Sequence, residues 1–519
     1  MLDAGRSIER PAFVGNPRRS LLWGVVSTTE RNRGGGDERL ERYVMIALII
    51  VISGAVLVGL LAYQPPATFD TLSSLNWSRD IWEGVMPNFA GYRVPTEHPL
   101  MLAIGLLLLP FGDAAPQMFV ALALVGYIAL LIAVFRFGVF VTGIFGGLVA
   151  IGLMATRLDV AWLAGVGFLD PPYAALICWA AYLEARSPRR GGLVWVLLIL
   201  AGLLRPEAWL LLGLYFLWVG YPLSWSGRFR ILCYTAIAPL IWLATDWFVT
   251  GNPLFSMTAT SRNAVDLGRS RPFETLPYYT LYWTNSVLKL PLSILAGLGV
   301  VLAIQQRRTQ LILPAILVAT TWFSYLVIAS GGLANVWRYI LIAVVGLILF
   351  ATYAVTGWSK VERGSTFKKL WAGAALLLVI AGFGWTVTHL NLTRIDEDVR
   401  RRRAITDQFR AIMTNPEVLK ARRCGAVSVP NQKLLPEAKW SFHLDPPAII
   451  PRSDTKIPVQ TEGVAILINP AYESRPDLNV NEYAVDNGWE ALQVPPPGFK
   501  FIASNEYFLA YGRCAPGSP

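Results

Sequence analysis

Long apolar stretches recur along the chain from Arg42 to about residue 388, and short polar loops separate them. The first stretch, Arg42–Ala62, is 21 residues long with one charge at its start, and about 20 apolar residues cross a bilayer as a helix. The stretch Pro99–Gly112 is apolar but short, which leaves open whether it crosses the bilayer or forms a re-entrant or interfacial helix. Hydropathy predicts further spans at 114–135, 138–155, 171–186, 193–204, 207–221, 229–249, 285–305, 310–330, 335–357 and 369–388. The pattern therefore predicts a polytopic α-helical membrane protein with about 11–12 transmembrane helices.

The two ends of the chain have a different pattern. Residues 1–41 are rich in Gly and Arg and carry mixed charge, which is typical of a disordered cytoplasmic tail. Residues 389–519 begin with a charged helical stretch and continue with short apolar runs that are typical of strands. These runs are Ala426–Val429, Val464–Asn469, Lys500–Ala503 and Tyr507–Tyr511. The sequence thus predicts a transmembrane domain over 42–388 and a small C-terminal α/β domain over 389–519.

The composition supports a membrane protein and excludes a string of soluble domains. Hydrophobic residues make up 54% of the 519 residues and charged residues only 15%, with a mean hydropathy of +0.47, whereas soluble chains carry about 25% charge. The 19 Trp and 19 Tyr supply the aromatic side chains that membrane interfaces favour.

The positive charges predict the orientation of the chain. The 45 basic and 34 acidic residues give a formal net charge of +11. Because basic residues in short loops face the cytoplasm, we expect the first loop 63–113, the loop Thr250–Thr284 and the C-terminal domain 389–519 to lie outside. The run Arg400–Arg403 opposes this topology, although charge counts for less in a long tail. The clusters that set the orientation are Arg186, Arg189 and Arg190; Arg228 and Arg230; Arg307 and Arg308; and Lys360, Arg363, Lys368 and Lys369. Since this topology and the membrane lipid account for the basic excess, we expect no nucleic acid partner.

The four cysteines fall into two pairs. Cys178 and Cys233 lie within predicted spans and are expected to be small buried apolar residues. Cys424 and Cys514 lie near the two ends of the C-terminal region. Their placement favours a disulfide over two free thiols, which indicates an oxidising outer compartment.

The first outer loop contains the most informative residues. Asp70 follows the first span by eight residues and precedes an amphipathic stretch with Trp77, Ile81 and Trp82, which is suited to the membrane interface. Farther on, Glu97-His98-Pro99-Leu100 leads into an apolar helix.

Four motifs in this order resemble the GT-C superfamily of membrane glycosyltransferases. They are the Asp in the first outer loop, His98-Pro99-Leu100, Asp170 before two prolines, and the turn Leu204-Arg205-Pro206-Glu207 between short helices. The resemblance covers about residues 40–210 and implies a sugar donor linked to polyprenyl phosphate. It further implies transfer to a glycan, lipid or protein acceptor at the outer face of a bacterial plasma membrane, with inversion. This chain lacks the Asp-Glu pair that many members carry after the first span.

The resemblance implies that Asp70 is the catalytic base, since glycosyl transfer needs a carboxylate to accept the proton of the acceptor hydroxyl. The structural alternative is that Asp70 caps the following helix. Asp80 is a second candidate, although its neighbour Arg79 favours a solvated ion pair. Asp170 matches the second Asp of the family, and its alternative is to cap the helix that begins at Pro171.

The leaving group is an anionic lipid phosphate, so the site needs an Arg, a Lys or a metal ion to stabilise the developing charge. Charged residues within a membrane domain are candidates for function. For Arg205 and Glu207, the alternative is a buried ion pair that only fixes helix packing. Glu97 and His98 are candidate ligands of a divalent cation or of the acceptor, and metal dependence stays open. The candidate substrate-binding residues are Asp80, Glu97, His98, Arg205, Glu207, Arg262, Lys289 and Arg338.

Two other classes of protein share part of this pattern. A transporter or flippase of a lipid-linked glycan is expected to place its charges in a central pathway, usually between repeated halves. A scaffold without a site would leave the Asp of the first loop exposed and without a partner. The chain contains no P-loop, no dinucleotide-binding fingerprint and no Cys/His zinc spacing.

Overall fold

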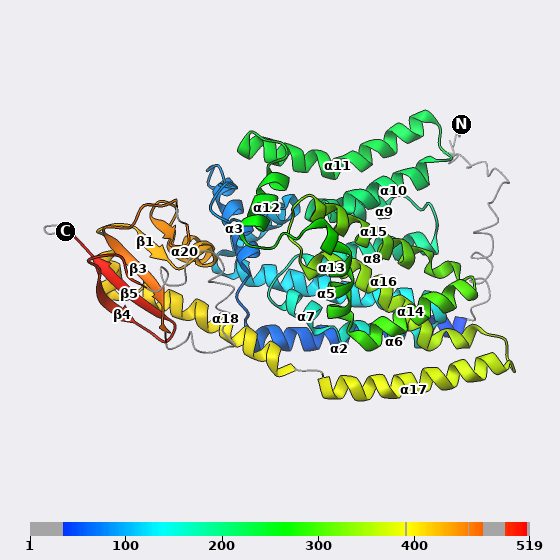
Figure 1. Ribbon diagram of the computed structural model, residues 1–519. Coiled ribbons are helices and arrows are strands. Elements are labelled where there is room, and N and C mark those ends of the chain that lie inside the picture. The colour runs from blue at the N-terminus through cyan, green and yellow to red at the C-terminus, as the bar shows by residue number, and fades with distance from the viewer. Residues whose placement is uncertain (1–34, 390–391, 455, 471–493, 516–519) are drawn as a thin grey trace, which may run out of the picture.

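The computed structural model describes residues 35–389, 392–454, 456–470 and 494–515. Most of the predicted tail 1–41 therefore lies outside the described residues. Figure 1 shows a bundle of helices with a small domain of helices and strands at one end.

The bundle contains long and short helices. Those up to residue 220 are α2 (Gly35–Tyr63), α3 (Phe69–Trp82), α4 (Pro99–Leu108), η1 (Leu109–Ala114), α5 (Ala115–Thr142), α6 (Ile144–Ala155), α7 (Leu158–Gly165), α8 (Asp170–Arg186), α9 (Leu193–Leu204) and α10 (Ala208–Gly220). Those from residue 225 to residue 389 are α11 (Trp225–Thr250), α12 (Phe255–Asp266), η2 (Phe273–Thr275), α13 (Leu276–Leu288), α14 (Leu290–Gln305), η3 (Thr309–Leu311), α15 (Ile312–Ser330), η4 (Trp337–Ile340), α16 (Leu341–Thr356), η5 (Gly357–Lys360) and α17 (Thr366–His389).

All the predicted spans are helical, but two boundaries differ from the prediction. The break between α5 and α6 lies at Gly143, where φ is 95°, and not at 136–137 as hydropathy suggested. The predicted span 285–305 contains a break at Lys289, where φ is 66° and the chain bends by 107° between α13 and α14. Apolar residues continue across Gly143, and at the second break a single lysine stands between apolar runs, so hydropathy alone does not detect either break. In the predicted outer loops, the structure adds the helices α7, α12 and α13.

Among the described residues, six helices are long and apolar enough to cross a membrane, or up to eight if each of two bent helix pairs is one span. The bent pairs are α6 with α7 and α13 with α14, and α9 and α10 are shorter apolar helices. This architecture is that of a multi-pass membrane protein.

Helix α16 forms the centre of the bundle. All its residues are buried, and it packs against α6, α14 and α15, as expected of a helix that is apolar on all sides. A Cβ atom at Gly299 of α14 would collide with the backbone of Phe350, so glycine permits the close approach of these two helices.

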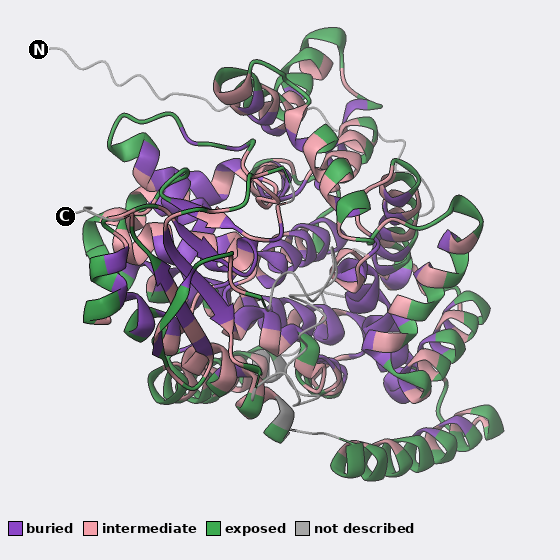
Figure 2. Ribbon diagram, turned by 60° about the vertical axis from the view of Figure 1, so that its left-hand side comes forward, coloured by how far each residue is buried: buried purple, intermediate pink, exposed green. Residues whose placement is uncertain are grey.

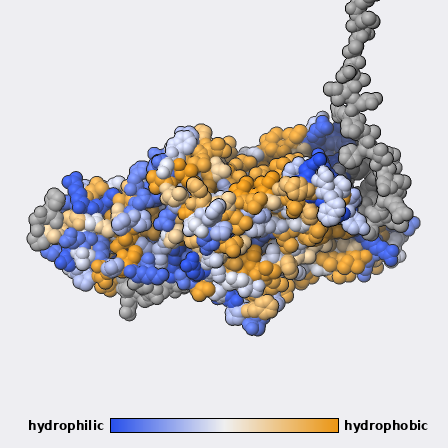
Figure 3. All heavy atoms as spheres, turned by 90° about the horizontal axis from the view of Figure 1, so that it is seen from above, coloured by the Kyte–Doolittle hydropathy of each residue, from blue (hydrophilic) through white to orange (hydrophobic). Residues whose placement is uncertain are grey.

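The outside of the bundle is also apolar. Helix α17 is exposed along its length in Figure 2, and its Leu376, Ile380 and Phe383 are 60–71% exposed. In Figure 3, hydrophobic side chains gather over the middle of the molecule and hydrophilic ones over the end formed by the C-terminal domain. Such an apolar belt suits contact with lipid.

The C-terminal domain is a small α/β unit, as predicted. Its elements are α18 (Leu392–Met413), α19 (Pro416–Ala421), β1 (Val427–Val429), η6 (Gln432–Leu434), α20 (Leu435–Phe442), β2 (Ile449–Pro451), β3 (Gly463–Ile468), β4 (Lys500–Ser504) and β5 (Phe508–Arg513). The sheet order is β2-β1-β3-β5-β4, in which β1 is parallel to β2 and β3, and β5 is antiparallel to β3 and β4. Strand β2 was not predicted because it is short, follows Pro446-Pro447 and ends on a proline. Cys424 and Cys514 form a disulfide.

The basic loops and the C-terminal domain lie at different ends of the bundle. Helices α2 and α17 both begin at the end far from this domain in Figure 1 and run toward it. Arg308 donates a hydrogen bond to the carbonyl of Lys360, so the loop after α14 adjoins the segment after α16. Arg189 donates one to the carbonyl of Trp218, so the loop after α8 adjoins the end of α10. The run Arg400–Arg403 lies on α18, where each arginine forms an ion pair with an aspartate three or four residues away. This pairing reduces the local positive charge.

Candidate active site

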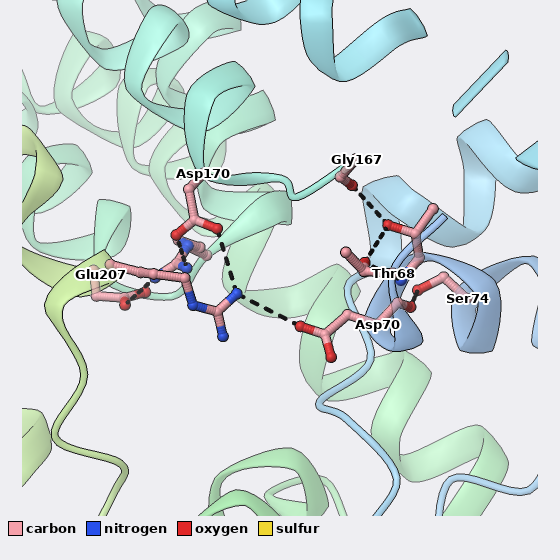
Figure 4. Close-up of polar contacts among 9 residues, drawn as sticks. Thr68, Asp70, Ser74, Gly167, Asp170 and Glu207 are labelled. Atoms are coloured by element: carbon pink, nitrogen blue, oxygen red, sulfur yellow. Dashed lines mark hydrogen bonds and ion pairs between the residues drawn. The ribbon is translucent and has the colours of Figure 1, made fainter. Parts of the chain in front are cut away.

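Five charged side chains of alternating sign form a line. Nη1 of Arg338 lies 3.6 Å from Oδ2 of Asp70 and 3.6 Å from Oδ2 of Asp170. Arg205 forms an ion pair with Oδ1 of Asp170 and, through Nη1, lies 3.2 Å from Oε1 of Glu207. Figure 4 shows Asp70 at one end of this line and Glu207 at the other. We call these five residues the charge line; its members come from four separate parts of the chain.

Asp70 occupies the first turn of α3 but does not cap it. Thr68 is the N-cap, and its hydroxyl accepts a hydrogen bond from the backbone N–H of Thr71 at 3.3 Å. The Thr71 hydroxyl in turn donates to the carbonyl of Gly167 at 2.6 Å, which ties α3 to the segment before α8. The side chain of Asp70, 30% exposed, therefore faces Arg338 instead of the helix end.

Asp170 begins α8, and its side chain makes no cap hydrogen bond. Its carboxylate is 1% exposed and contacts both arginines of the charge line. Burying a carboxylate requires compensating charge, and the two guanidinium groups provide it. The ion pairs therefore replace the predicted capping role.

Arg205 sits in the break between α9 and α10, where Pro206 prevents one continuous helix. Its residue exposure is 5%, and its guanidinium lies 4.8 Å from the ring centre of Tyr339 and 5.6 Å from that of Tyr173. The aromatic rings and the two carboxylates together hold this cation within the bundle.

Arg338 belongs to η4 and follows the turn Gly331-Gly332. Gly332 has a φ of 81°, and a Cβ there would lie 2.8 Å from Oγ of Ser261, so the turn requires glycine. The guanidinium lies 4.4 Å from the ring centre of Phe168. Its side chain is 23% exposed, which leaves part of the cation accessible to a ligand.

His98 and Glu97 lie next to each other in sequence but have different partners. His98 precedes α4, forms a hydrogen bond with the backbone of Leu204, and packs edge-on against Trp242 at 5.7 Å. Burial, together with the nearby arginines of the charge line, lowers the pKa of His98 to about 3. The imidazole is therefore neutral at physiological pH.

Glu97 is 2% exposed and faces Asp246 of α11, which sequence analysis did not single out. Asp246 accepts hydrogen bonds from the backbone N–H of Ser256 at 2.9 Å and from its hydroxyl at 2.7 Å. Burial and the adjacent Asp246 raise the pKa of Glu97 well above its usual range. An acidic residue inside a predicted span was the available signal for Asp246.

The described part of the chain contains no group of three or more His, Cys, Asp and Glu side chains that could hold a metal ion. Glu97 and Asp246 offer two adjacent carboxyl groups, whereas His98 is directed to other partners. A divalent cation at this point would need further oxygen ligands from water or substrate.

Three other candidates have partners or positions outside the charge line. Asp80 is paired with Lys439 of the C-terminal domain at 2.8 Å, so the predicted solvated pair with Arg79 is wrong. Lys289 is half-exposed at the break before α14, 3.9 Å from Asp159. Arg262 is exposed on α12.

A small pocket adjoins the Glu207 end of the charge line. Hydroxyl-bearing side chains of α15 line one side of it, and Arg205 and two tyrosines line the other. Its lining residues are Tyr173, Arg205, Glu207, Leu211, Thr320, Thr321, Ser324, Tyr339 and Ile342.

This arrangement of a helical bundle with a small C-terminal domain is also found in a solved structure. The solved structure of ArnT from Cupriavidus metallidurans bound to undecaprenyl phosphate shares it, with a TM-score of 0.52 and 12% identity, over 90% of this chain and 97% of ArnT. The apo structure of the same ArnT covers equal shares, with a TM-score of 0.49 and 15% identity. No family model and no curated protein matches the chain. The resemblance based on four motifs is thus confirmed at the level of the fold.

Proposed function

We propose that the protein is a membrane glycosyltransferase. It transfers a sugar from a polyprenyl-phosphate carrier to an acceptor at the outer face of a bacterial plasma membrane. The observation that carries this proposal is the charge line, which sets a partly exposed carboxylate, Asp70, beside a partly exposed guanidinium, Arg338. A carboxylate next to a cation is the pair that base-assisted displacement of a phosphate requires.

In the proposed reaction, the hydroxyl oxygen of the acceptor attacks the anomeric carbon of the sugar. Asp70 accepts the proton of that hydroxyl at the same time. The bond between that carbon and the phosphate oxygen breaks, and its electron pair leaves with the polyprenyl phosphate. Arg338 stabilises the charge that grows on the phosphate. A single displacement of this kind inverts the anomeric configuration.

Asp170 and Arg205 have supporting roles in this proposal. Asp170 is buried and contacts both arginines, so it fixes Arg338 in the position where it meets the phosphate. Preorganised charges cost no reorganisation during the reaction. Arg205 and the hydroxyl-lined cavity next to it supply further groups for the donor head group.

The polyprenyl carrier is supported by two features. ArnT, which shares the fold, was solved with undecaprenyl phosphate. In this chain α15 lines the cavity with Thr320, Thr321 and Ser324, while Phe323 and Val327 of the same helix are exposed. An apolar exterior next to a pocket that contains hydroxyl groups suits a ligand with a lipid tail and a charged head group.

The outer location is supported by the ends of the bundle. The basic loops lie away from the C-terminal domain, as the positive-inside rule demands if that domain is extracytoplasmic. The disulfide Cys424–Cys514 also suits an oxidising compartment. The acceptor is a glycan, a lipid or a protein that reaches this face.

The test is an assay of the purified protein against a panel of polyprenyl-phosphate sugars. The wild type transfers sugar from one of these donors, and Asp70→Asn loses transfer. Asp113→Asn, at an exposed aspartate of η1, is the matched control and keeps wild-type activity. Transfer by Asp70→Asn at the wild-type rate would show that Asp70 is not the base. Movement of lipid-linked sugar across vesicles without transfer would favour the flippase.

A further inference from the structure

Helix α3 presents one polar face to helix α20 of the C-terminal domain. Asn76, Arg79 and Asp80 are spaced by three and four residues and so share one side of α3. Asn76 is 3% exposed and donates its side-chain N–H to the carbonyl of Pro436 at 2.9 Å. This contact joins two segments that are 360 residues apart in the chain.

Arg79 binds the C-terminal end of α20. Its guanidinium donates to the carbonyls of Lys439 at 2.7 Å and Trp440 at 3.2 Å, and it lies 5.1 Å from the ring centre of Trp440. The last carbonyls of a helix lack partners within the helix. Arg79 supplies a partner for the Trp440 carbonyl from the other domain and a second donor for the Lys439 carbonyl, which also accepts from the backbone N–H of His443 at 3.1 Å. It also brings a favourable positive charge.

Asp80 anchors the same contact by an ion pair. It is 5% exposed, and its carboxylate accepts from Nζ of Lys439 at 2.8–2.9 Å. Lys439 also contacts Asp445 at 2.6 Å. Burial raises the pKa of Asp80, and Lys439 opposes the rise. Loss of the lysine would therefore leave a buried carboxyl group without its compensating charge.

The membrane domain also holds α3, near both of its ends. Thr71 donates to the carbonyl of Gly167 at 2.6 Å, and Ser78 donates to the carbonyl of Leu102 at 3.1 Å. Asp70 lies in the first turn, so its position relative to Arg338 depends on the orientation of the whole helix. The bundle thus contacts α3 along its length, and the C-terminal domain contacts the polar face near its C-terminal end.

We infer that the C-terminal domain positions the base: contacts of α20 with Arg79 and Asp80 orient α3 and so set Asp70 against Arg338. Arg79, Asp80 and Lys439 are positioning residues in this sense. The consequence for catalysis rests on the proposed function, whereas the orientation of α3 does not.

Hydrogen exchange on the full-length protein tests the orientation without any assay of activity. Lys439→Ala and Arg79→Ala are expected to accelerate amide exchange over Phe69–Trp82 by about tenfold or more. Lys420→Ala, at an exposed lysine of α19, leaves it unchanged. Wild-type exchange over α3 in both variants would overturn the inference, even if the protein proves to be no glycosyltransferase.

Kinetics test the consequence once a donor is known. Lys439→Ala is expected to lower kcat by about 10- to 100-fold, because small displacements of reacting groups have effects of that size. We expect the Lys439→Ala variant to bind one polyprenyl phosphate per chain with an unchanged Kd. A variant that had partly unfolded would bind less than one donor per chain. Lys439→Arg, which keeps the charge, restores kcat.

A double-substitution cycle separates positioning from general damage. If Arg79 acts through Asp70, Arg79→Ala causes no further loss in an Asp70→Asn background. Losses that multiply in the double variant would contradict the proposed route. A wild-type protein that transfers no sugar from the donor panel would refute the proposed function, and the hydrogen-exchange result would still test whether α20 orients α3.

Discussion

Helix α3 carries two aspartates whose environments differ sharply. Asp70 is 30% exposed in its side chain and lies 3.6 Å from Arg338, whereas Asp80 is 8% exposed and lies 2.8 Å from Lys439. The first keeps an accessible face and a loose contact, as a group that exchanges a proton with a substrate requires. Asp80 is buried and forms an ion pair with the C-terminal domain. The partner, and not the residue type, therefore separates a reactive carboxylate from a structural one.

Exchanging each aspartate for asparagine gives the largest contrast. Asp70→Asn is expected to lower transfer by about 10²- to 10⁴-fold, the usual contribution of a general base. The melting temperature of Asp70→Asn stays close to the wild-type value because the Asp70 side chain is partly exposed. Transfer rates and melting temperatures of Asp70→Asn and Asp80→Asn test these expectations. Equal activity losses for Asp70→Asn and Asp80→Asn would remove the distinction drawn here.

Arg338→Gln probes the partner of the reactive aspartate. We expect transfer to fall by about 10²- to 10³-fold, as when one charge-stabilising donor is removed from an active site. The fall reflects weaker stabilisation of the leaving phosphate. Steady-state kinetics with a polyprenyl-phosphate donor measure it, and Arg230→Gln, at an exposed arginine of α11, is the control. Unchanged kcat in Arg338→Gln would exclude the assigned role.

The contribution of Asp80 to stability is expected to depend on pH. Because burial raises its pKa, the folded state binds this proton more tightly than the unfolded state does. By linkage, protonation of Asp80 stabilises the folded state as the pH falls through the raised pKa. This stabilisation is lost as the pH rises through the same pKa. The free energy of unfolding of the wild type, relative to Asp80→Asn, is therefore expected to increase between pH 7 and pH 4. Chemical unfolding of both proteins at several pH values measures it, and an opposite trend would contradict the raised pKa.

The smallest expected effect concerns His98. Its pKa of about 3 keeps the imidazole neutral from pH 5 to pH 8, so the pH–rate profile should contain no step from this residue. His98→Asn is expected to change the rate without changing the shape of the profile. A step near pH 6.5 that disappears in the variant would show that His98 is more solvated than its contacts with Leu204 and Trp242 indicate.

Hydropathy predicted most of the fold, because about 20 apolar residues in a row have few alternatives to a helix in lipid. It did not locate the bend at Lys289 or the helices α7, α12 and α13, where apolar and polar residues mix. The motif order indicated Asp70, Asp170 and the Arg205–Glu207 turn, and the structure joins them with Arg338 in one line. It did not indicate Asp246 as the neighbour of Glu97, since a single acid in a span carries no information about its partner.

Hydropathy and motifs predict a membrane-embedded helical chain with a separate C-terminal α/β domain, and they indicate the charged residues of the site. These properties follow from local composition and from short motifs, which are visible one segment at a time. Which charges meet depends on the packing of the folded chain. Arg338 bridges Asp70 and Asp170, and Lys439 reaches Asp80 across 359 positions of the chain. Such pairs depend on how helices pack over long separations, and ion-pair energy is set by distance and burial that no local pattern encodes.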